Sequence, residues 1–422
     1  MTEGQWNRGR KRLIWIDQAR GVAMLLVILG HAQLGKVSQS FIYSFHMPLF
    51  FIISGLTFQK EKARNQRLGA YLVKHGKRLV VPYFWCNFAM FPMWFLQHRV
   101  LTRVQDEGFF SVLKGIFYSN SLVMDATANP TWFFLTLFLA LAGYKIVLNL
   151  SRGDEWKELV LVITCGFLAF ADRGKDLPWH LNTSFCGIVF LYLGTKLMEI
   201  GYSDRDGAIY GWMKRKGPIG RKCRCLAVMI AAGLLCWRVN GRVSMHGNKY
   251  GKSLLLFYVT AILFSCVIVQ ICIWLPRIRM LTYIGRHTIL LVALHTSLLQ
   301  LGRWFFPVFG QSRGYALLLA VLVTLLLLPV TAGLIRLAPF LEGCESEGRT
   351  ANCVGRVVMT YAAACIPFYY ALRTVGINMR GNFSMGLGMN VLLLLLCIAF
   401  VLWARRRCPL IFLDRCPDGN GF

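Results

Sequence analysis

Three polar side chains lie within an otherwise apolar stretch near the start of the sequence, DQARGVAMLLVILGH at residues 17–31. Asp17 and Arg20 stand near its beginning, and His31 ends it. If the stretch is an α-helix, the eleven positions from Arg20 to His31 make three turns plus about 20°, so both side chains share one face about 16 Å apart. Asp17, three residues before Arg20, lies on the same face.

This stripe offers proton transfer and anion recognition. Imidazole titrates near neutral pH, so His31 can act as a general base. Arg20 is always charged and suits an anionic group, while Asp17 either holds Arg20 in position or forms a plain ion pair with it. Charges inside a membrane span are costly unless they face a protein interior or a water-filled cavity. The stripe therefore predicts an inward-facing polar track. The alternative is that Asp17 and Arg20 pair at one interface while His31 reaches the other.

The composition indicates the kind of scaffold that carries these residues. Of the 422 residues, 56% are hydrophobic and 16% are charged, whereas soluble proteins carry about 25% charged residues. The apolar residues come in blocks of about 15 to 25, long enough to cross a hydrocarbon core of about 30 Å. The alternating segments of about ten residues that are typical of a membrane β-barrel do not occur. The sequence therefore predicts an all-α, polytopic transmembrane helical bundle.

The charge and the cysteines exclude two other classes of partner. The net charge is +28, but the basic residues lie between the apolar blocks, which indicates membrane topology and a lipid bilayer rather than nucleic acid. The fourteen cysteines are scattered, and the one close pair, Cys223 and Cys225, lacks the spacing of a zinc site. We predict no metal.

Twelve spans are predicted along the chain, and the shortest of them, 158–172, contains Gly166. Their approximate bounds are 13–34, 41–59, 79–98, 131–150, 158–172, 182–201, 225–240, 253–275, 283–306, 314–337, 351–372 and 387–404. No internal repeat relates the two halves.

Basic residues predict the orientation of these spans. The N-terminus has RGRKR, the loop after the second span has seven basic residues and one acid, and RRR follows the last span from Arg405. Both ends are therefore expected in the cytoplasm, in a multi-pass protein of the cell membrane. The basic loop at residues 238–252 is expected outside and breaks this rule. The predicted parts are a cytoplasmic tail at 1–12, a ten-span domain at 13–340, two further spans at 341–404 and a second tail at 405–422.

Several short motifs resemble those of one membrane family. R-x10-H in the first span is followed by FHMPLFFIISG at 45–55, KRLVVPYFW from Lys77, NPTWFF from Asn129 and IGRHTILLVALH from Ile284. In this order the sequence resembles the membrane-bound acyltransferase family three, which includes O-acetyltransferases of surface polysaccharides and a fucose 4-O-acetylase-like branch. The resemblance covers roughly residues 12 to 340, the usual ten spans. It does not extend to the last two spans.

The resemblance implies an O-acetyltransferase that uses acetyl-CoA as acyl donor and a cell-surface or lipid-linked carbohydrate as acceptor. His31 would be the general base, with an acetyl-histidine intermediate as a variant. Arg20, with Asp17, would orient the donor. The arginine-rich signature that relatives carry after the second span is partly replaced by lysine at Lys74, Lys77 and Arg78. These three residues would contact the phosphates of coenzyme A, unless they mark only the cytoplasmic side.

Three further residues are candidates for binding the acceptor. His46 lies near the outer end of the second span, and Trp132 could stack on a sugar ring or anchor its span at the interface. His295 lies about twelve residues into the ninth span, where a histidine is costly.

Two other classes of function stay open from the sequence alone. Twelve spans with both ends inside are also common in secondary transporters of small polar solutes or glycan precursors, although a transporter should show two related halves. A structural or sensory membrane protein would leave the intramembrane histidines and Arg20 without a role.

Overall fold

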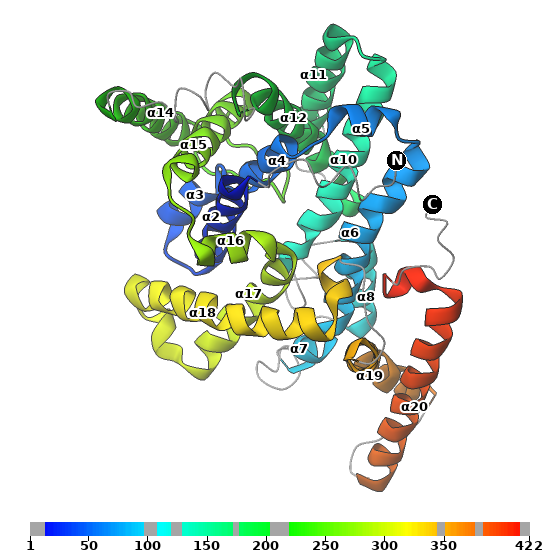
Figure 1. Cartoon of the computed structure of the whole chain (residues 1–422). Helices are drawn as coiled ribbons and strands as arrows, with labels where there is room; N and C mark the ends of the chain where they lie inside the picture. Colours follow the sequence, from blue (N-terminus) through cyan, green and yellow to red (C-terminus); the bar gives the residue numbers. More distant parts are fainter. Residues whose placement is uncertain are drawn as a thin grey trace.

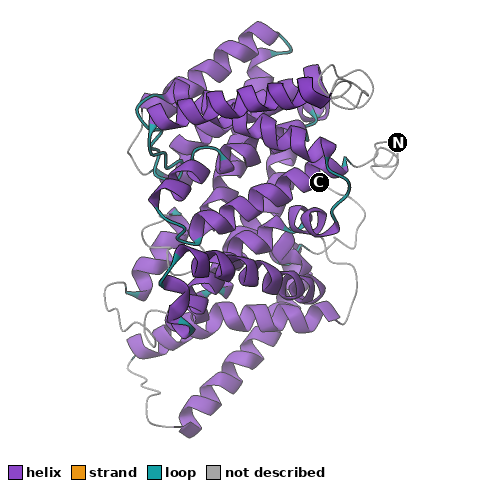
Figure 2. Ribbon diagram, turned by 90° about the vertical axis from the view of Figure 1, so that its left-hand side faces the viewer, coloured by secondary structure: helices purple, strands orange, loops and turns teal. Residues whose placement is uncertain are grey.

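The computed structural model describes residues 13–96, 108–119, 129–171, 177–202, 219–343, 351–375 and 383–413. The predicted tail at 1–12 and the end of the second predicted tail, 414–422, lie outside these residues. Within them the chain is helical and forms no strand beyond one isolated bridge between Ser244 and Lys249. The predicted all-α class is confirmed (Figures 1 and 2).

In several places along the chain, one helix ends and the next begins after a short break. The first half of the chain has α2 (Ile14–His31), α3 (Lys36–Tyr43), α4 (His46–Leu56), α5 (Lys60–Asn65), α6 (Leu68–Ala89), α7 (Phe91–Phe95), α8 (Phe109–Tyr118), η2 (Asn129–Thr131), α10 (Trp132–Ser151), α11 (Glu155–Ala171), η3 (Pro178–His180), α12 (Leu181–Leu197) and η4 (Met198–Tyr202). The second half has α14 (Ile219–Asn240), α15 (Leu254–Trp274), α16 (Arg279–Arg286), α17 (Thr288–Phe305), η5 (Pro307–Gly310), α18 (Arg313–Leu337), η6 (Pro339–Glu342), α19 (Ala351–Thr374), α20 (Phe383–Arg407) and η7 (Pro409–Ile411).

Eight helical segments in the described part of the chain are long and apolar enough to cross a membrane. They coincide with eight of the twelve predicted spans. The other four predicted segments are helical but differ in character. The span at 79–98 falls on α6, whose first half is basic, and on the short α7. The span at 158–172 is α11, of 17 residues. The one at 283–306 is divided between α16 and α17 at His287, and the one at 351–372 is α19.

Glycine allows the helices around α2 and α4 to approach closely. A Cβ atom on Gly21 of α2 would lie 2.2 Å from the carbonyl oxygen of Leu281 in α16, and one on Gly285 would lie 1.8 Å from that of Asp17. In the same way, a Cβ on Gly55 of α4 would lie 2.2 Å from the carbonyl oxygen of Leu191 in α12. Small residues of this kind are what membrane helices use to bring their backbones together.

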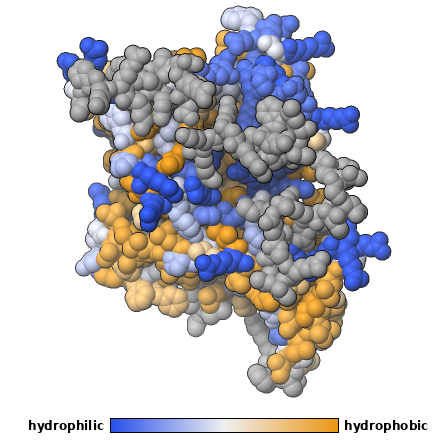
Figure 3. All heavy atoms as spheres, viewed as in Figure 1, coloured by the Kyte–Doolittle hydropathy of each residue, from blue (hydrophilic) through white to orange (hydrophobic). Residues whose placement is uncertain are grey.

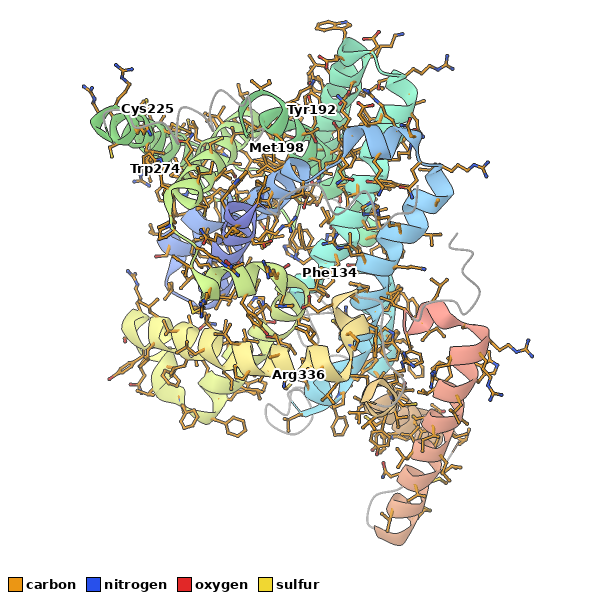
Figure 4. The ribbon with its side chains drawn as sticks, in the orientation of Figure 1. Phe134, Tyr192, Met198, Cys225, Trp274 and Arg336 are labelled. Atoms are coloured by element: carbon orange, nitrogen blue, oxygen red, sulfur yellow. The ribbon has the colours of Figure 1, made fainter. Side chains whose placement is uncertain are left out.

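The helices form a bundle in which α2 packs on α4, α15, α16 and α17, while α6 packs on α10 and α19 (Figure 1). Exposed leucines and valines cover α18 and α20, where Figure 3 shows apolar surface. A membrane accommodates such surface. The interior between the helices is filled with side chains such as Phe134 of α10, which is 2% exposed (Figure 4).

The last two helices are joined to the bundle through the end of the chain. The indole Nε1 of Trp85 in α6 donates a hydrogen bond of 2.6 Å to the carbonyl oxygen of Ile411. The ring of Phe412 stacks at 5.3 Å on Trp85 and packs at 5.4 Å on Phe340. Although α20 itself projects away from the bundle (Figure 1), its C-terminal end is therefore fixed against α6 and η6.

Candidate active site

His31 ends α2, and its ring lies beside that of His295 from α17. The two ring centroids are 5.1 Å apart, and the ring planes meet at 81°. Each Nδ1 lies 3.0 Å from a backbone carbonyl of its own helix, that of Val27 for His31 and those of Leu291 and Val292 for His295. A carbonyl can only accept, so each Nδ1 carries the hydrogen, and each Nε2 is the proton-accepting nitrogen of a neutral ring.

A break between α3 and α4 brings two more rings to this place. Tyr43 is the last residue of α3, and His46 is the first residue of α4. The Tyr43 ring lies 6.1 Å from His31 and 5.0 Å from His46. His46 is buried, and its Nδ1 lies 2.8 Å from the carbonyl oxygen of Ile42. Four rings from α2, α3, α4 and α17 thus follow one another, and the structure brings together three residues that the sequence had placed in separate spans.

Arg20 lies nearer the start of α2, on the same helix as His31. Its Nη2 donates a hydrogen bond of 3.1 Å to the hydroxyl of Thr57, the residue that follows α4. Thr57 in turn donates to the carbonyl oxygens of Ile53 and Ser54. The guanidinium is therefore held against the C-terminal end of α4, about three helical turns from the histidines.

Asp17 has a partner that the sequence did not indicate. Its Oδ2 accepts from Nε of Arg286 in α16 at 3.1 Å, and the Asp17 side chain is 4% exposed while that of Arg286 is 35% exposed. The neighbouring Gln18 also binds this region, because its Oε1 accepts from the backbone N–H of Ile278 at 2.7 Å. The start of α2 is thus tied to α16.

The basic residues predicted to meet the donor lie on the first half of α6. Lys74 and Arg78 are exposed, and Lys77 is half-buried. Between them, His75 packs on Tyr71 at 4.3 Å. Burial, together with the charges of Lys74 and Arg78, lowers the pKa of His75 to about 4. His75 is therefore neutral near pH 7, and the positive charge of this half of α6 comes from its lysines and arginine.

Trp132 begins α10 and is 6% exposed, which places it inside the bundle rather than at a lipid interface. Its ring lies 5.2 Å from His180 of η3 and 5.8 Å from His246 in the loop between α14 and α15. The two imidazoles are 5.9 Å apart. His180 and the preceding Trp179 both have left-handed backbone conformations, with φ of 52° and 58°. The structure thus groups Trp132 with two histidines apart from the His31 cluster.

Sequence reasoning missed Tyr43, Thr57, His180, His246 and Arg286. Arg286 lies in the motif IGRHTILLVALH, inside the predicted span at 283–306, where a charged residue is costly and could have drawn attention to it. The others belong to no motif and carry no spacing signal, because they come from helix ends and a loop that only the folded chain brings together.

Comparison with known proteins gives the family. Residues 13–335 match the acyltransferase domain of acyltransferase family 3, which is more than half of the chain. The chain belongs to this family. No curated protein and no solved structure matches it. The resemblance seen in the motifs is confirmed at the level of the family, and the protein is a multi-pass membrane acyltransferase. The matched residues include α2, with Arg20 and His31, and α17, with His295.

Proposed function

We propose that this acyltransferase moves an acetyl group from cytoplasmic acetyl-CoA to a hydroxyl of a cell-surface or lipid-linked carbohydrate. The observation that carries the proposal is the orientation of His31. Its Nδ1–H is occupied by the carbonyl of Val27, so Nε2 is the nitrogen that can take a proton. The ring is half-buried at the C-terminal end of α2. The same helix carries a half-buried arginine, Arg20.

The reaction can be written with this chain's residues. Nε2 of His31 removes the proton of the acceptor hydroxyl as its oxygen attacks the thioester carbonyl. The new C–O bond forms, the C–S bond breaks, and the proton passes from His31 to the leaving thiolate, which gives free coenzyme A. No net proton is released. A direct transfer of this kind needs no acetyl-histidine, although the same nitrogen could form one.

Arg20 has the position of a donor-orienting charge. The hydrogen bond to Thr57 holds the guanidinium of Arg20 at the C-terminal end of α4, and a guanidinium suits an anionic or carbonyl oxygen. Asp17 serves this role indirectly, since its ion pair with Arg286 fixes the start of α2. Lys74, Lys77 and Arg78 would meet the coenzyme phosphates on the cytoplasmic side. The proposal includes an orientation with both chain termini in the cytoplasm, and the cell membrane as the membrane that the protein spans.

The acceptor would reach the histidines from the opposite side. Trp132, with His180 and His246, forms an aromatic and polar cluster whose side chains are of the kind that bind a sugar ring. His46, which is joined to His31 through Tyr43, would contact the acceptor beside His31. A carbohydrate acceptor and an acetyl donor together define an O-acetyltransferase. Within this class, we propose the fucose 4-O-acetylase-like branch as the place of this protein.

The proposal is tested with purified protein in nanodiscs and acetyl-CoA labelled in the acetyl group. We expect wild type to transfer label to a carbohydrate acceptor or, slowly, to water, and His31→Ala to lose at least 100-fold of this rate, the range for removal of a general base. Thr164→Ala, an exposed position on α11, is the matched control. Undiminished transfer by a folded His31→Ala protein would refute the role of His31, and no transfer from acetyl-CoA by wild type would refute the function.

A further inference from the structure

The basic loop at residues 238–252, which includes the end of α14 and the connection to α15, forms a short hairpin. Ser244 and Lys249 pair in an antiparallel bridge, where the backbone N–H of Ser244 donates at 2.8 Å and that of Lys249 donates in return at 2.9 Å. At the tip, the backbone carbonyl of Met245 accepts a hydrogen bond of 3.1 Å from the hydroxyl of Thr183 in α12. The loop is therefore fixed against the bundle.

The exposed residues of this connection are all basic. Within residues 241–252 they are Arg242, Lys249 and Lys252, and Arg238 in the last turn of α14 is exposed as well. The hydrophobic side chains of the connection are buried, namely Val243, Met245 and Tyr250. The loop thus presents positive charge to its surroundings from a rigid base.

Acidic residues on the helices beside the loop lie at the far ends of those helices. Neither α14 nor α15 contains an acid. Trp132 and Thr183, near the starts of α10 and α12, lie on the side of the loop, whereas Glu155 and Glu199 follow the other ends of these helices. The separation along each helix is about 25 to 30 Å, well beyond the screening length of about 8 Å in physiological salt. Within the described chain, none of the loop's basic side chains forms an ion pair.

His246 brings the loop next to the proposed acceptor site. Its ring lies 5.8 Å from that of Trp132 and 5.9 Å from that of His180. Positive charge around a site raises the local concentration of anionic ligands and speeds their association by about 10- to 1,000-fold. Membrane topology disfavours lysine and arginine on the outer side, so their presence on this loop calls for a role. The loop therefore indicates a negatively charged ligand on the acceptor side.

We propose that the acceptor is an acidic glycan chain, and that Arg242, Lys249 and Lys252 bind carboxylates on saccharides that flank the acetylated one. The acetylated saccharide lies at His31, and the chain continues past Trp132 to the basic loop. This assignment rests on the proposed function and narrows its acceptor from carbohydrates in general to those that carry uronic acids or similar carboxylated sugars.

The arrangement of the charges favours carboxylates over a phosphate. Phosphate sites usually gather backbone N–H groups and side chains around one anion. In the hairpin, the backbone N–H groups of Lys249 and Lys252 are already bonded, to the carbonyl oxygens of Ser244 and Asn240. The charges come from exposed side chains, one on the first arm of the hairpin and two on the second. Such a row of separate charges suits single negative charges spaced along a sugar chain.

The first test measures binding without acetyl-CoA, so that it does not depend on transfer. Protein in nanodiscs of phosphatidylcholine is titrated by calorimetry with a panel of uronic acid hexasaccharides and with the same hexasaccharides after reduction of their carboxylates to primary alcohols. We expect wild type to bind at least one acidic form about 10-fold more tightly than its reduced form, the sum of three exposed charge pairs. Higher salt should remove this preference. Arg242→Gln/Lys249→Gln/Lys252→Gln should bind both forms alike.

Two controls separate the position of the charges from their number and from the shape of the loop. Arg221→Gln/Arg224→Gln/Arg277→Gln removes three exposed charges from the opposite ends of α14 and α15, and this variant should keep the preference for the acidic form. A variant of the loop in which arginine becomes lysine and both lysines become arginine should keep it too. If wild type binds no acidic hexasaccharide more tightly than its reduced form, the proposal is wrong.

A transfer assay with labelled acetyl-CoA completes the test. The glutamine variant of the loop should raise KM for the acidic acceptor about 10-fold and leave kcat unchanged, because these side chains touch no reacting atom. Binding through the loop without any acetyl transfer would refute the proposed function but support the carboxylate site, whereas equal transfer to acidic and reduced acceptors would refute the site alone. Nanodiscs containing phosphatidylglycerol test a lipid role. If the glutamine variant loses bound phosphatidylglycerol in native mass spectrometry, yet binds acidic hexasaccharides like wild type, the loop binds lipid headgroups and the proposal is overturned.

Discussion

Gly285→Ala tests the contact that sets α2 against α16. The added Cβ would lie 1.8 Å from the carbonyl oxygen of Asp17, whereas close carbon–oxygen contacts in proteins begin at about 3.3 Å. The two backbones must therefore separate by roughly 1.5 Å at this point. Overpacking of this kind costs about 1–3 kcal/mol, and here the obstacle is backbone that cannot rotate away. Better helix propensity returns at most about 1 kcal/mol.

Gly333→Ala on α18 is the matched control, because no atom lies within 4 Å of the added Cβ. The two variants share the propensity gain, so the difference in their stability isolates the overpacking cost of about 1–3 kcal/mol. The measurement is unfolding in detergent, followed by tryptophan fluorescence. We expect Gly333→Ala to be as stable as wild type or slightly more so, and Gly285→Ala to melt several degrees lower.

Gly285→Ala should also affect catalysis, because α16 leads directly into α17, the helix that carries His295. We expect Gly285→Ala to lower acetyl transfer even at temperatures where the protein stays folded, because α2 and its His31 move relative to α17. If Gly285→Ala matches Gly333→Ala in both stability and activity, the close approach of the two helices is wrong, and with it the spacing of the two histidines.

Three further outcomes follow from buried or shifted charges. Asp17→Asn should cost about 1–3 kcal/mol of unfolding free energy, less than a fully buried pair because Arg286 is 35% exposed, and Arg286→Gln should add little to it in the double variant. Glu158→Gln should lower the free energy of unfolding, measured by chemical denaturation, by about 3–5 kcal/mol, because the Glu158 side chain is 0% exposed and lies 2.8 Å from Nζ of Lys60. Glu61→Gln is the control, since the Glu61 side chain is 81% exposed and its loss should cost under about 1 kcal/mol. The pKa of His75 is about 4, below its ordinary 6.5, so the unfolded chain binds more protons between these values and stability falls as the pH drops through them. His75→Asn should therefore lose less thermal stability than wild type between pH 7 and pH 5, and an equal loss would contradict the burial of this ring.

The sequence was sufficient for the class of the fold because hydrophobicity and length are local properties. Blocks of about 20 apolar residues can cross a membrane only as helices, since backbone polar groups have no other partners there. Breaks within the blocks were harder to predict. The ninth predicted span divides at His287, where no proline marks the break, and the second divides between Tyr43 and His46, just before Pro48 in the first turn of α4. These breaks depend on packing against distant helices, which a local pattern does not contain.

The same distinction applies to the candidate site. Helical geometry was enough to put Arg20 and His31 on one helix and to mark His295 as a costly residue within a span. It could not give the partner of Asp17, because Arg286 lies 269 residues further along the chain. The sequence marked Trp132 as an aromatic anchor or a platform for a sugar ring. It could not reveal the two imidazoles beside Trp132, because His180 and His246 come from separate parts of the chain.

The partners of α2 explain how one helix could serve a donor and an acceptor that arrive from opposite sides. Asp17 binds α16, Arg20 binds the end of α4, and His31 meets α17. Three side chains that a helical wheel places on one face therefore contact three different helices, because the neighbours cross α2 at different heights. A change in the tilt of α2 would consequently alter the donor end and the acceptor end together. This coupling predicts that variants at Asp17 should raise KM for acetyl-CoA and also KM for the carbohydrate acceptor, although Asp17 touches neither substrate. Variants at His295 should change only the acceptor KM, so an Asp17 variant with altered donor KM and unaltered acceptor KM would show that the two ends of α2 act independently.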